Sequence, residues 1–153
     1  AANLQARNAR EELRESVHLL SGASEQLTLR EMLLSIVHES TDGTGIVIRT
    51  DIDEIELCKA KQRFLCNTLK EGISNGLRHG NATAFYFELK QKGDKIAFLL
   101  SDNGSGMDQA KLRKGFGLKG MYARAEALGG SVRCETEPDE GFEIRIDLPA
   151  DNP

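Results

Sequence analysis

Hydrophobic residues recur every three or four positions over the first half of the chain, which is the spacing of one helix face. Residues 3–20 carry such a stripe between charged residues. A second stripe follows Thr28, and Thr28 with Glu31 fits the capping-box pattern that opens a helix. The third and longest stripe runs from Leu57 to Arg78. Three amphipathic helices are therefore expected in the first half of the chain.

The hydrophobic period then changes to two. Residues alternate over Phe85–Leu89 and Ile96–Leu100, and Lys92-Gly93-Asp94 separates the two runs, which predicts a hairpin with one buried face. This order of elements predicts an α+β fold, with helices layered on one face of a mixed sheet. The other expected elements are a strand at 46–48, a loop at 102–114, a helix at 118–128, and strands at 131–136 and 142–148.

Composition indicates an ordinary globular domain. With 29% charged residues and a net charge of −4, the chain has no basic patch for nucleic acid and no apolar run long enough for a membrane span. The first residues do not form a signal peptide, and the missing initial Met indicates a fragment of a longer chain. Three cysteines without C-x-x-C spacing argue for a reducing compartment, and all three are expected to be small, partly buried hydrophobic residues.

A glycine-rich stretch, Gly115 to Gly120, precedes the last predicted helix and fits G-x-G-x-x-G. A dinucleotide fold needs a buried strand immediately before this pattern, whereas polar residues precede it here. Glycines let backbone N–H groups approach an anion, and a helix start adds unpaired N–H groups and the positive end of the dipole. Lys119 adds a charge. A phosphate cradle and a solvated loop without ligand fit this stretch equally well.

A polar stripe lies on the longest predicted helix, where Glu71, Asn75 and His79 recur every fourth residue and Arg78 lies beside them. An asparagine carbonyl oxygen suits Mg²⁺, which takes few protein ligands besides phosphate oxygens and water. Without further context, an ordinary solvated helix face is the favoured interpretation of this stripe.

The sequence Asp102-Asn103-Gly104-Ser105-Gly106-Met107 directly follows a predicted strand. A carboxylate there can accept a hydrogen bond from an exocyclic amine such as adenine N6. Gly104 and Gly106 let a flat ring lie against the backbone, and Met107 can pack on its face. A plain turn is the alternative, and a calcium loop is excluded because glycines occupy positions that need ligand oxygens.

In this order and spacing, the three motifs resemble the N box and the two G boxes of the ATP-binding domain of the GHKL superfamily. The run "GFGLKGMYARAEALGG" is especially similar to bacterial sensor histidine kinases of the nitrate-sensor and desaturase-thermosensor group. Residues 27–150 resemble the catalytic domain of that group. Residues 1–22 look like part of its dimerisation and phosphotransfer hairpin, namely the second helix.

The resemblance implies a Bergerat-type α/β sandwich that binds ATP and Mg²⁺, with a lid over about 106–116. Asp102 would bind adenine N6, Asn75 would coordinate Mg²⁺, and Glu71 would polarise water or orient the metal shell. The catalytic residues carried over by position are Glu71 and Asn75. The ATP-binding residues carried over are Asn75, Arg78, His79, Asp102, Gly104, Gly106, Met107, Gly115, Gly117, Leu118, Lys119 and Gly120.

The implied reaction transfers the γ-phosphoryl of ATP to a histidine and thence to a response regulator. The resemblance further implies that this domain is cytoplasmic, that the full-length kinase is a homodimer, and that this parent protein could be membrane-anchored. Neither His18 nor His38 is expected to be the acceptor, so this fragment is expected to bind ATP without autophosphorylating. Phe142 stands where the family usually has Thr, which removes a hydrogen-bond partner near adenine. A serine kinase of the anti-sigma type and a nucleotide-sensing module without transferase activity stay open as alternatives.

Overall fold

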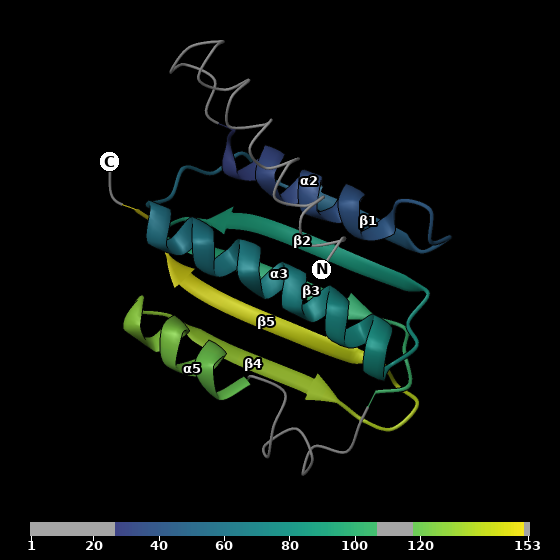
Figure 1. Cartoon of the computed structure of the whole chain (residues 1–153). Coiled ribbons are helices and arrows are strands. Elements are labelled where there is room, and N and C mark those ends of the chain that lie inside the picture. The colour runs from purple at the N-terminus through teal and green to yellow at the C-terminus, as the bar shows by residue number, and fades with distance from the viewer. Residues whose placement is uncertain (1–26, 107–117, 152–153) are drawn as a thin grey trace, which may run out of the picture.

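The computed structural model describes residues 27–106 and 118–151, so the helix expected at 3–20 lies outside the described residues. Inside those ranges every expected element is present, with shifts of a few residues at the boundaries. The helices are α2 (Leu29–Thr41), α3 (Lys59–His79) and α5 (Leu118–Ala127), and the strands are β1 (Val47–Ile52), β2 (Ala84–Lys92), β3 (Lys95–Asp102), β4 (Ser131–Thr136) and β5 (Phe142–Pro149) (Figure 1).

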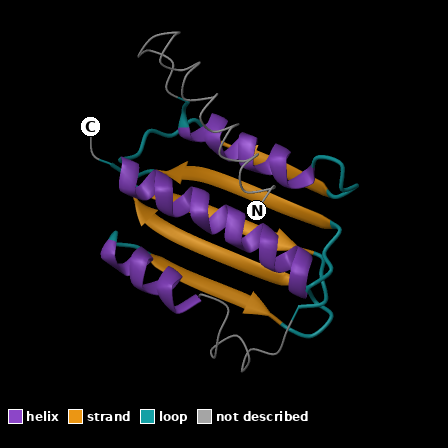
Figure 2. Cartoon of the chain, in the orientation of Figure 1, coloured by secondary structure: helices purple, strands orange, loops and turns teal. Residues whose placement is uncertain are grey.

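The five strands form one mixed sheet in the order β1-β2-β3-β5-β4. Strand β1 runs parallel to β2, and every other neighbouring pair is antiparallel. All three described helices cover the same face of the sheet (Figure 2). The observed architecture is therefore the predicted one, an α+β fold with helices on one face of a mixed sheet.

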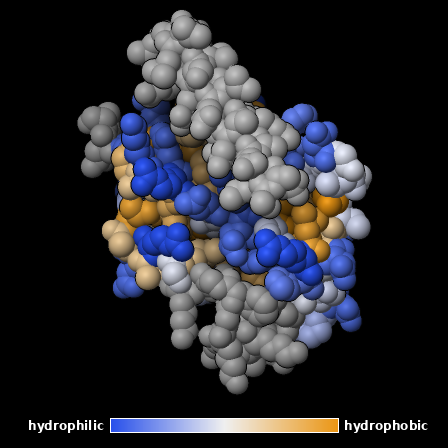
Figure 3. Space-filling model, viewed as in Figure 1, coloured by the Kyte–Doolittle hydropathy of each residue, from blue (hydrophilic) through white to orange (hydrophobic). Residues whose placement is uncertain are grey.

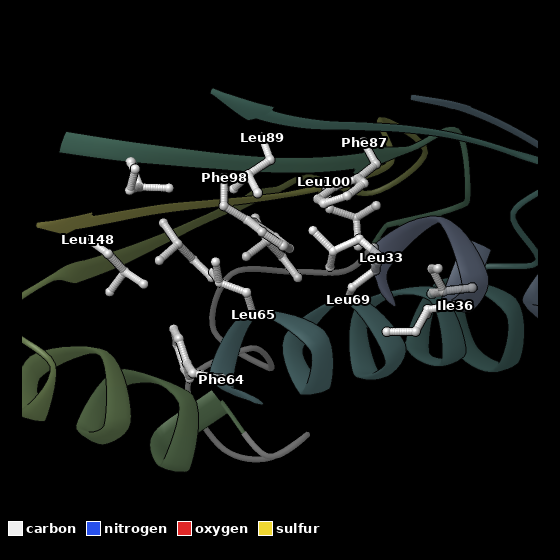
Figure 4. Close-up of a cluster of buried hydrophobic side chains, with 14 of the residues drawn as sticks. Leu33, Ile36, Phe64, Leu65, Leu69, Phe87, Leu89, Phe98, Leu100 and Leu148 are labelled. Atoms are coloured by element: carbon white, nitrogen blue, oxygen red, sulfur yellow. The ribbon is translucent and has the colours of Figure 1, made fainter. Parts of the chain in front are cut away.

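The hydrophobic core lies between the sheet and the helices (Figure 4). Alternate residues of β2 and β3 point into it, and the rings of Phe87 and Phe98 pack at a centroid distance of 5.1 Å. Leu65 and Leu69 of α3 are completely buried against them. Each such side chain contributes roughly 1.5–3 kcal/mol by leaving water, which is why the period-two and helical patterns identified these elements correctly.

The capping box at the start of α2 is confirmed. The Glu31 N–H donates to the Thr28 hydroxyl oxygen at 3.2 Å, and the Thr28 N–H donates to Glu31 Oε1 at 3.4 Å. Two backbone N–H groups that a helix start leaves without partners are thereby satisfied within four residues of sequence.

The start of α3 is held by a residue from the other end of the chain. The Asp151 carboxylate accepts hydrogen bonds from the backbone N–H of Cys58, the N-cap residue, and from Lys61 Nζ, the latter at 2.7 Å. Lys61 Nζ also donates to the Pro149 carbonyl oxygen at 2.7 Å. The hydrogen bond from Lys61 is the main reason that the pKa of Asp151 lies below its ordinary value. This arrangement fixes the N-terminus of α3 to the end of β5.

The cysteines occupy three different environments. Cys66 is half-buried and Cys134 is buried, and burial raises the pKa of both thiols, which keeps them protonated. Cys58 is exposed at the N-cap of α3. The expectation of partial burial is therefore wrong for Cys58, because hydrophobicity says nothing about a position that ends up at a helix terminus.

Candidate functional site

The C-terminal half of α3 lies against the end of β3, and Gly76 makes this approach possible. A Cβ at Gly76 would lie 2.9 Å from Asp102 Oδ2 and 2.7 Å from Cε2 of Phe85. Those distances are far inside van der Waals contact, so only glycine fits at this position without a shift of its neighbours. The Asp102 carboxylate consequently lies directly beside α3.

Asp102 is the last residue of β3, and its side chain is half-buried. Burial raises the pKa of this carboxyl, while hydrogen bonds from the backbone N–H groups of Gly104 and Phe142 oppose the rise. The Gly104 N–H donates to Asp102 Oδ1 at 2.8 Å. A partly desolvated carboxylate held in one orientation is a strong and selective acceptor for a ligand amine.

The loop after Asp102 is fixed to α3 and to the start of β2. Gly104 packs on Gly80, where a Cβ on Gly104 would lie 2.6 Å from the carbonyl oxygen, and the Ser105 N–H donates to that oxygen at 2.8 Å. Asn103 Oδ1 accepts a hydrogen bond from the Thr83 N–H at 3.0 Å. Sequence reasoning assigned no role to Asn103, although an Asp-Asn-Gly turn is where a side chain commonly bonds nearby backbone.

Gly106 begins the segment predicted as a lid, and its φ of 63° lies in the left-handed region. A Cβ there would lie 2.9 Å from the hydroxyl oxygen of Thr136. Thr136 is 4% exposed and donates to the Gly141 carbonyl oxygen at 2.7 Å. Phe142 pairs with Asp102 on one side and with Thr136 on the other, so the three side chains share one face of the sheet. Thr136 is a second polar group at this end of the sheet that sequence reasoning missed.

The predicted polar stripe lies on α3 beside this carboxylate. Asn75 is half-buried and adjacent to Gly76, whereas Glu71, Arg78 and His79 are exposed. Within the described ranges, the side chains of Glu71 and Asn75 form no hydrogen bond or ion pair. Glu71 lies about 6 Å from Asn75 along the helix axis, on the side away from Asp102.

The described helix α5 begins at Leu118, so Leu118, Lys119 and Gly120 form its first turn. The structure does not describe the side chains of the first two. Three other predicted binding residues, Met107, Gly115 and Gly117, lie outside the described residues.

A groove of about 530 Å³ lies between α3 and α5. The groove adjoins the polar stripe, since Glu71 belongs to the stripe and also lines the groove. Sequence reasoning assigned no binding role to its other lining residues, which are Phe64, Asn67, Thr68, Lys70, Ser74, Met121 and Arg124. Seen from the helical side, hydrophilic surface predominates across the middle of the molecule (Figure 3).

Among the described residues, no group of three or more His, Cys, Asp or Glu side chains is arranged to hold a metal ion. Mg²⁺ does not need such a group, because it commonly binds one or two protein oxygens together with phosphate oxygens and water. The amide oxygen of Asn75, which has no hydrogen-bond partner among the described residues, fits that kind of coordination.

Comparison with protein families identifies residues 60–152 as matching the family described as histidine kinase-, DNA gyrase B-, and HSP90-like ATPase. The match extends from the start of α3 to the end of β5 and so includes every element that contributes to the site. The resemblance drawn from the three motifs is confirmed at the level of the family.

Curated relatives cover most of the chain. It is 31% identical to the signal transduction histidine-protein kinase/phosphatase UhpB of Salmonella typhimurium, over 82% of this chain and 25% of that protein. Identity to the sensor histidine kinase LnrJ of Bacillus subtilis is 30%, over 94% and 36% of the two chains. Sensor protein VraS of Staphylococcus aureus is 29% identical, over 87% and 39%. The chain thus spans between a quarter and two fifths of the length of these relatives.

Solved structures share the fold at low sequence identity. The histidine kinase AdeS of Acinetobacter baumannii matches with a TM-score of 0.66 at 17% identity, over 97% of this chain and 82% of that one. The ATP binding domain of PrrB from Mycobacterium tuberculosis matches with a TM-score of 0.60 at 18% identity, over 82% and 96%. The expected Bergerat-type fold is therefore confirmed.

Proposed function

Because the chain belongs to the family of histidine kinase-, DNA gyrase B- and HSP90-like ATPases, we propose that it is the catalytic ATP-binding domain of a two-component sensor histidine kinase. Its reaction is transfer of the γ-phosphoryl of ATP to a histidine. The observation that carries this proposal is the contact between Asp102 and Gly76. It sets an acceptor for a purine amine against the turn of α3 that carries Asn75, the group suited to a metal-bound phosphate.

In the proposed complex, Asp102 accepts a hydrogen bond from adenine N6, and Gly104 and Gly106 leave room for the ring. Asn75 supplies an amide oxygen to Mg²⁺, and the bound ion neutralises phosphate charge. Phosphoryl transfer depends mainly on positioning and charge stabilisation, and Glu71 is placed to orient water or the metal shell. The remaining phosphate contacts are assigned to Arg78, His79, Lys119 and the backbone of Gly117 to Gly120, with Met107 and Gly115 in the lid.

The assignments beyond the site follow from the same proposal. Residues 27–150 form the ATP-binding domain, and residues 1–22 are part of a dimerisation hairpin. The full kinase is a homodimer that passes the phosphoryl group to a response regulator, and this domain works in the cytoplasm. None of the described helices has the length and apolar character that crossing a bilayer requires.

Calorimetry of the 153-residue chain tests the site. Asn75→Ala should abolish the Mg²⁺-dependent part of ATP binding without lowering the thermal midpoint, because Asn75 makes no hydrogen bond within the described ranges. Gln91→Ala is the matched control, since it also removes a carboxamide. Gln91 lies at the end of β2 that is remote from Asp102, so this variant should bind MgATP like the parent. Parent-like binding by Asn75→Ala would show that the amide does not hold the metal.

The reaction itself is tested on the full-length product of the reading frame, incubated with radiolabelled MgATP. Phosphohistidine is labile in acid and stable in alkali, so the label should resist alkali and disappear in acid. An acid-stable label on serine of a partner would instead favour the anti-sigma type of kinase. Nucleotide binding without any label would favour a sensing module and contradict the proposal.

A further inference from the structure

The groove between α3 and α5 extends the site away from the purine end. Asp102 contacts α3 at Gly76, whereas the groove begins at Ser74 and Glu71 and continues towards Phe64, at the N-terminal end of the helix. Its floor contains the buried side chains of Phe64, Thr68 and Met121. A nucleotide held by its base at Asp102 would therefore direct its terminal phosphate towards this groove.

Arg124 lines the groove from α5 and folds back over the first turn of that helix. Its Nε donates to the Gly120 carbonyl oxygen at 3.1 Å, and a Cβ on Gly120 would lie 3.0 Å from Arg124 Nη2. The guanidinium therefore packs on the surface that glycine leaves open. Helical side chains point towards the N-terminus, which is why a residue in the last turn reaches the first.

The charge of Arg124 is only partly compensated at this position. The hydrogen bond to the Gly120 carbonyl oxygen stabilises the guanidinium, while the partial positive charge at the N-terminus of the helix opposes it. Arg124 also forms no ion pair within the described ranges that would offset this repulsion. An anion bound in the groove would supply the ionic partner that the described residues do not give to Arg124.

Lys70 lines the same groove from α3 and is also without an ion pair in the described part of the chain. The groove thus holds two cations and one carboxylate, Glu71, although the whole chain has a net charge of −4. A second hollow, of about 450 Å³ where β4 ends and β5 begins, has the opposite character, because the carboxylates that line it are those of Asp102, Glu135, Glu137, Glu140 and Glu143. Of these two hollows, only the groove between α3 and α5 suits a phosphate.

We propose that Arg124 and Lys70 bind the terminal phosphate of ATP in the groove between α3 and α5, and so make the site prefer ATP to ADP. This inference rests on the proposed function. Arg124 approaches from α5 and Lys70 from α3, so the phosphate links the two helices when it binds. ADP lacks the phosphate that reaches the groove and gains nothing from either cation.

Calorimetric titration of the 153-residue chain with MgATP and with MgADP tests this inference. Arg124→Ala should weaken MgATP binding about tenfold, the size of one charge-assisted hydrogen bond, and leave MgADP binding within about twofold of the parent. Lys70→Ala should act in the same direction, and Arg124→Lys should recover part of the loss. Arg133→Ala is the matched control, because Arg133 is an exposed arginine on β4 paired with Glu135.

Equal losses for MgATP and MgADP, or unchanged MgATP binding in both alanine variants, would overturn the inference and leave the proposed function standing. A parent chain that binds neither nucleotide would overturn the proposed function as well. Thermal unfolding midpoints of the variants are expected to match the parent, since Arg124 and Lys70 are both exposed.

Discussion

Replacing Gly76 by alanine tests the contact on which the proposed site depends. Carbon atoms pack at about 3.5–4.0 Å, whereas the new Cβ would lie 2.7 Å from Cε2 and 2.8 Å from Cζ of Phe85. The Phe85 ring is 3% exposed and cannot move into solvent. Helix α3 or the Asp102 carboxylate, 2.9 Å from the new atom, must therefore shift.

The effect on stability is small because two terms oppose each other. Overpacking a core costs roughly 1–3 kcal/mol, while alanine is better than glycine in a helix by about 1 kcal/mol. The net loss in the free energy of unfolding should be about 0–2 kcal/mol, measured by urea denaturation. The affinity for MgATP should fall about tenfold, which corresponds to about 1.4 kcal/mol, because displacement of Asp102 weakens a charge-assisted hydrogen bond.

Gly72→Ala is the matched control on the same helix. A Cβ there would meet Leu100 and would lie 3.2 Å from Cδ1 of Ile144, which are side-chain atoms that do not belong to the site. We expect a similar loss of stability and parent-like affinity for MgATP. If Gly72→Ala weakens binding as much as Gly76→Ala does, or if neither changes it, the argument that α3 positions Asp102 for the nucleotide is wrong.

Two further predictions concern carboxylates. Burial raises the pKa of Asp102, so the affinity of the parent for MgATP should begin to fall on acidification at a pH above the ordinary aspartate value of about 3.9. In calorimetry, Asp102→Asn should bind MgATP more weakly than the parent and with less selectivity for adenine. Its affinity should not show this pH dependence. Asp151→Asn should lower the free energy of unfolding by about 1 kcal/mol near pH 7, because the carboxylate that caps α3 and pairs with Lys61 is lost. The pKa of Asp151 is lowered in the folded chain, so its contribution is present above about pH 4 and disappears as the pH falls through the lowered value. Urea denaturation should show the difference between the parent and Asp151→Asn shrinking as the pH falls below the ordinary aspartate value of about 3.9, and a difference that does not shrink on acidification would contradict this assignment.

The sequence by itself determined the elements that depend on local physics. The capping box at Thr28, the apolar stripes of α2 and α3, and the alternation along β2 and β3 are set by neighbours within a few residues. Those patterns were sufficient to predict an α+β fold with helices on one face of the sheet. The three motifs were likewise sufficient to identify the family.

Pairing between distant segments was decided only by the tertiary structure. Strand β1 was expected to end at Ile48 but continues to Ile52, because its later residues pair with β2 in parallel. The exposed Arg49 and Asp51 interrupt the apolar run and hid this extension from the sequence. The strand order β1-β2-β3-β5-β4 has no local signal at all.

The geometry of the site was likewise decided only by the tertiary structure. Motif spacing named Asn75 and Asp102, but only the close packing of Gly76 on Phe85 brings their two segments together. Arg124 and Lys70 belong to none of the three motifs and line one groove only because α3 and α5 pack side by side on one face of the sheet. Hydrophobic burial selects each element locally, whereas the distances that make a binding site arise from how those elements pack on one another.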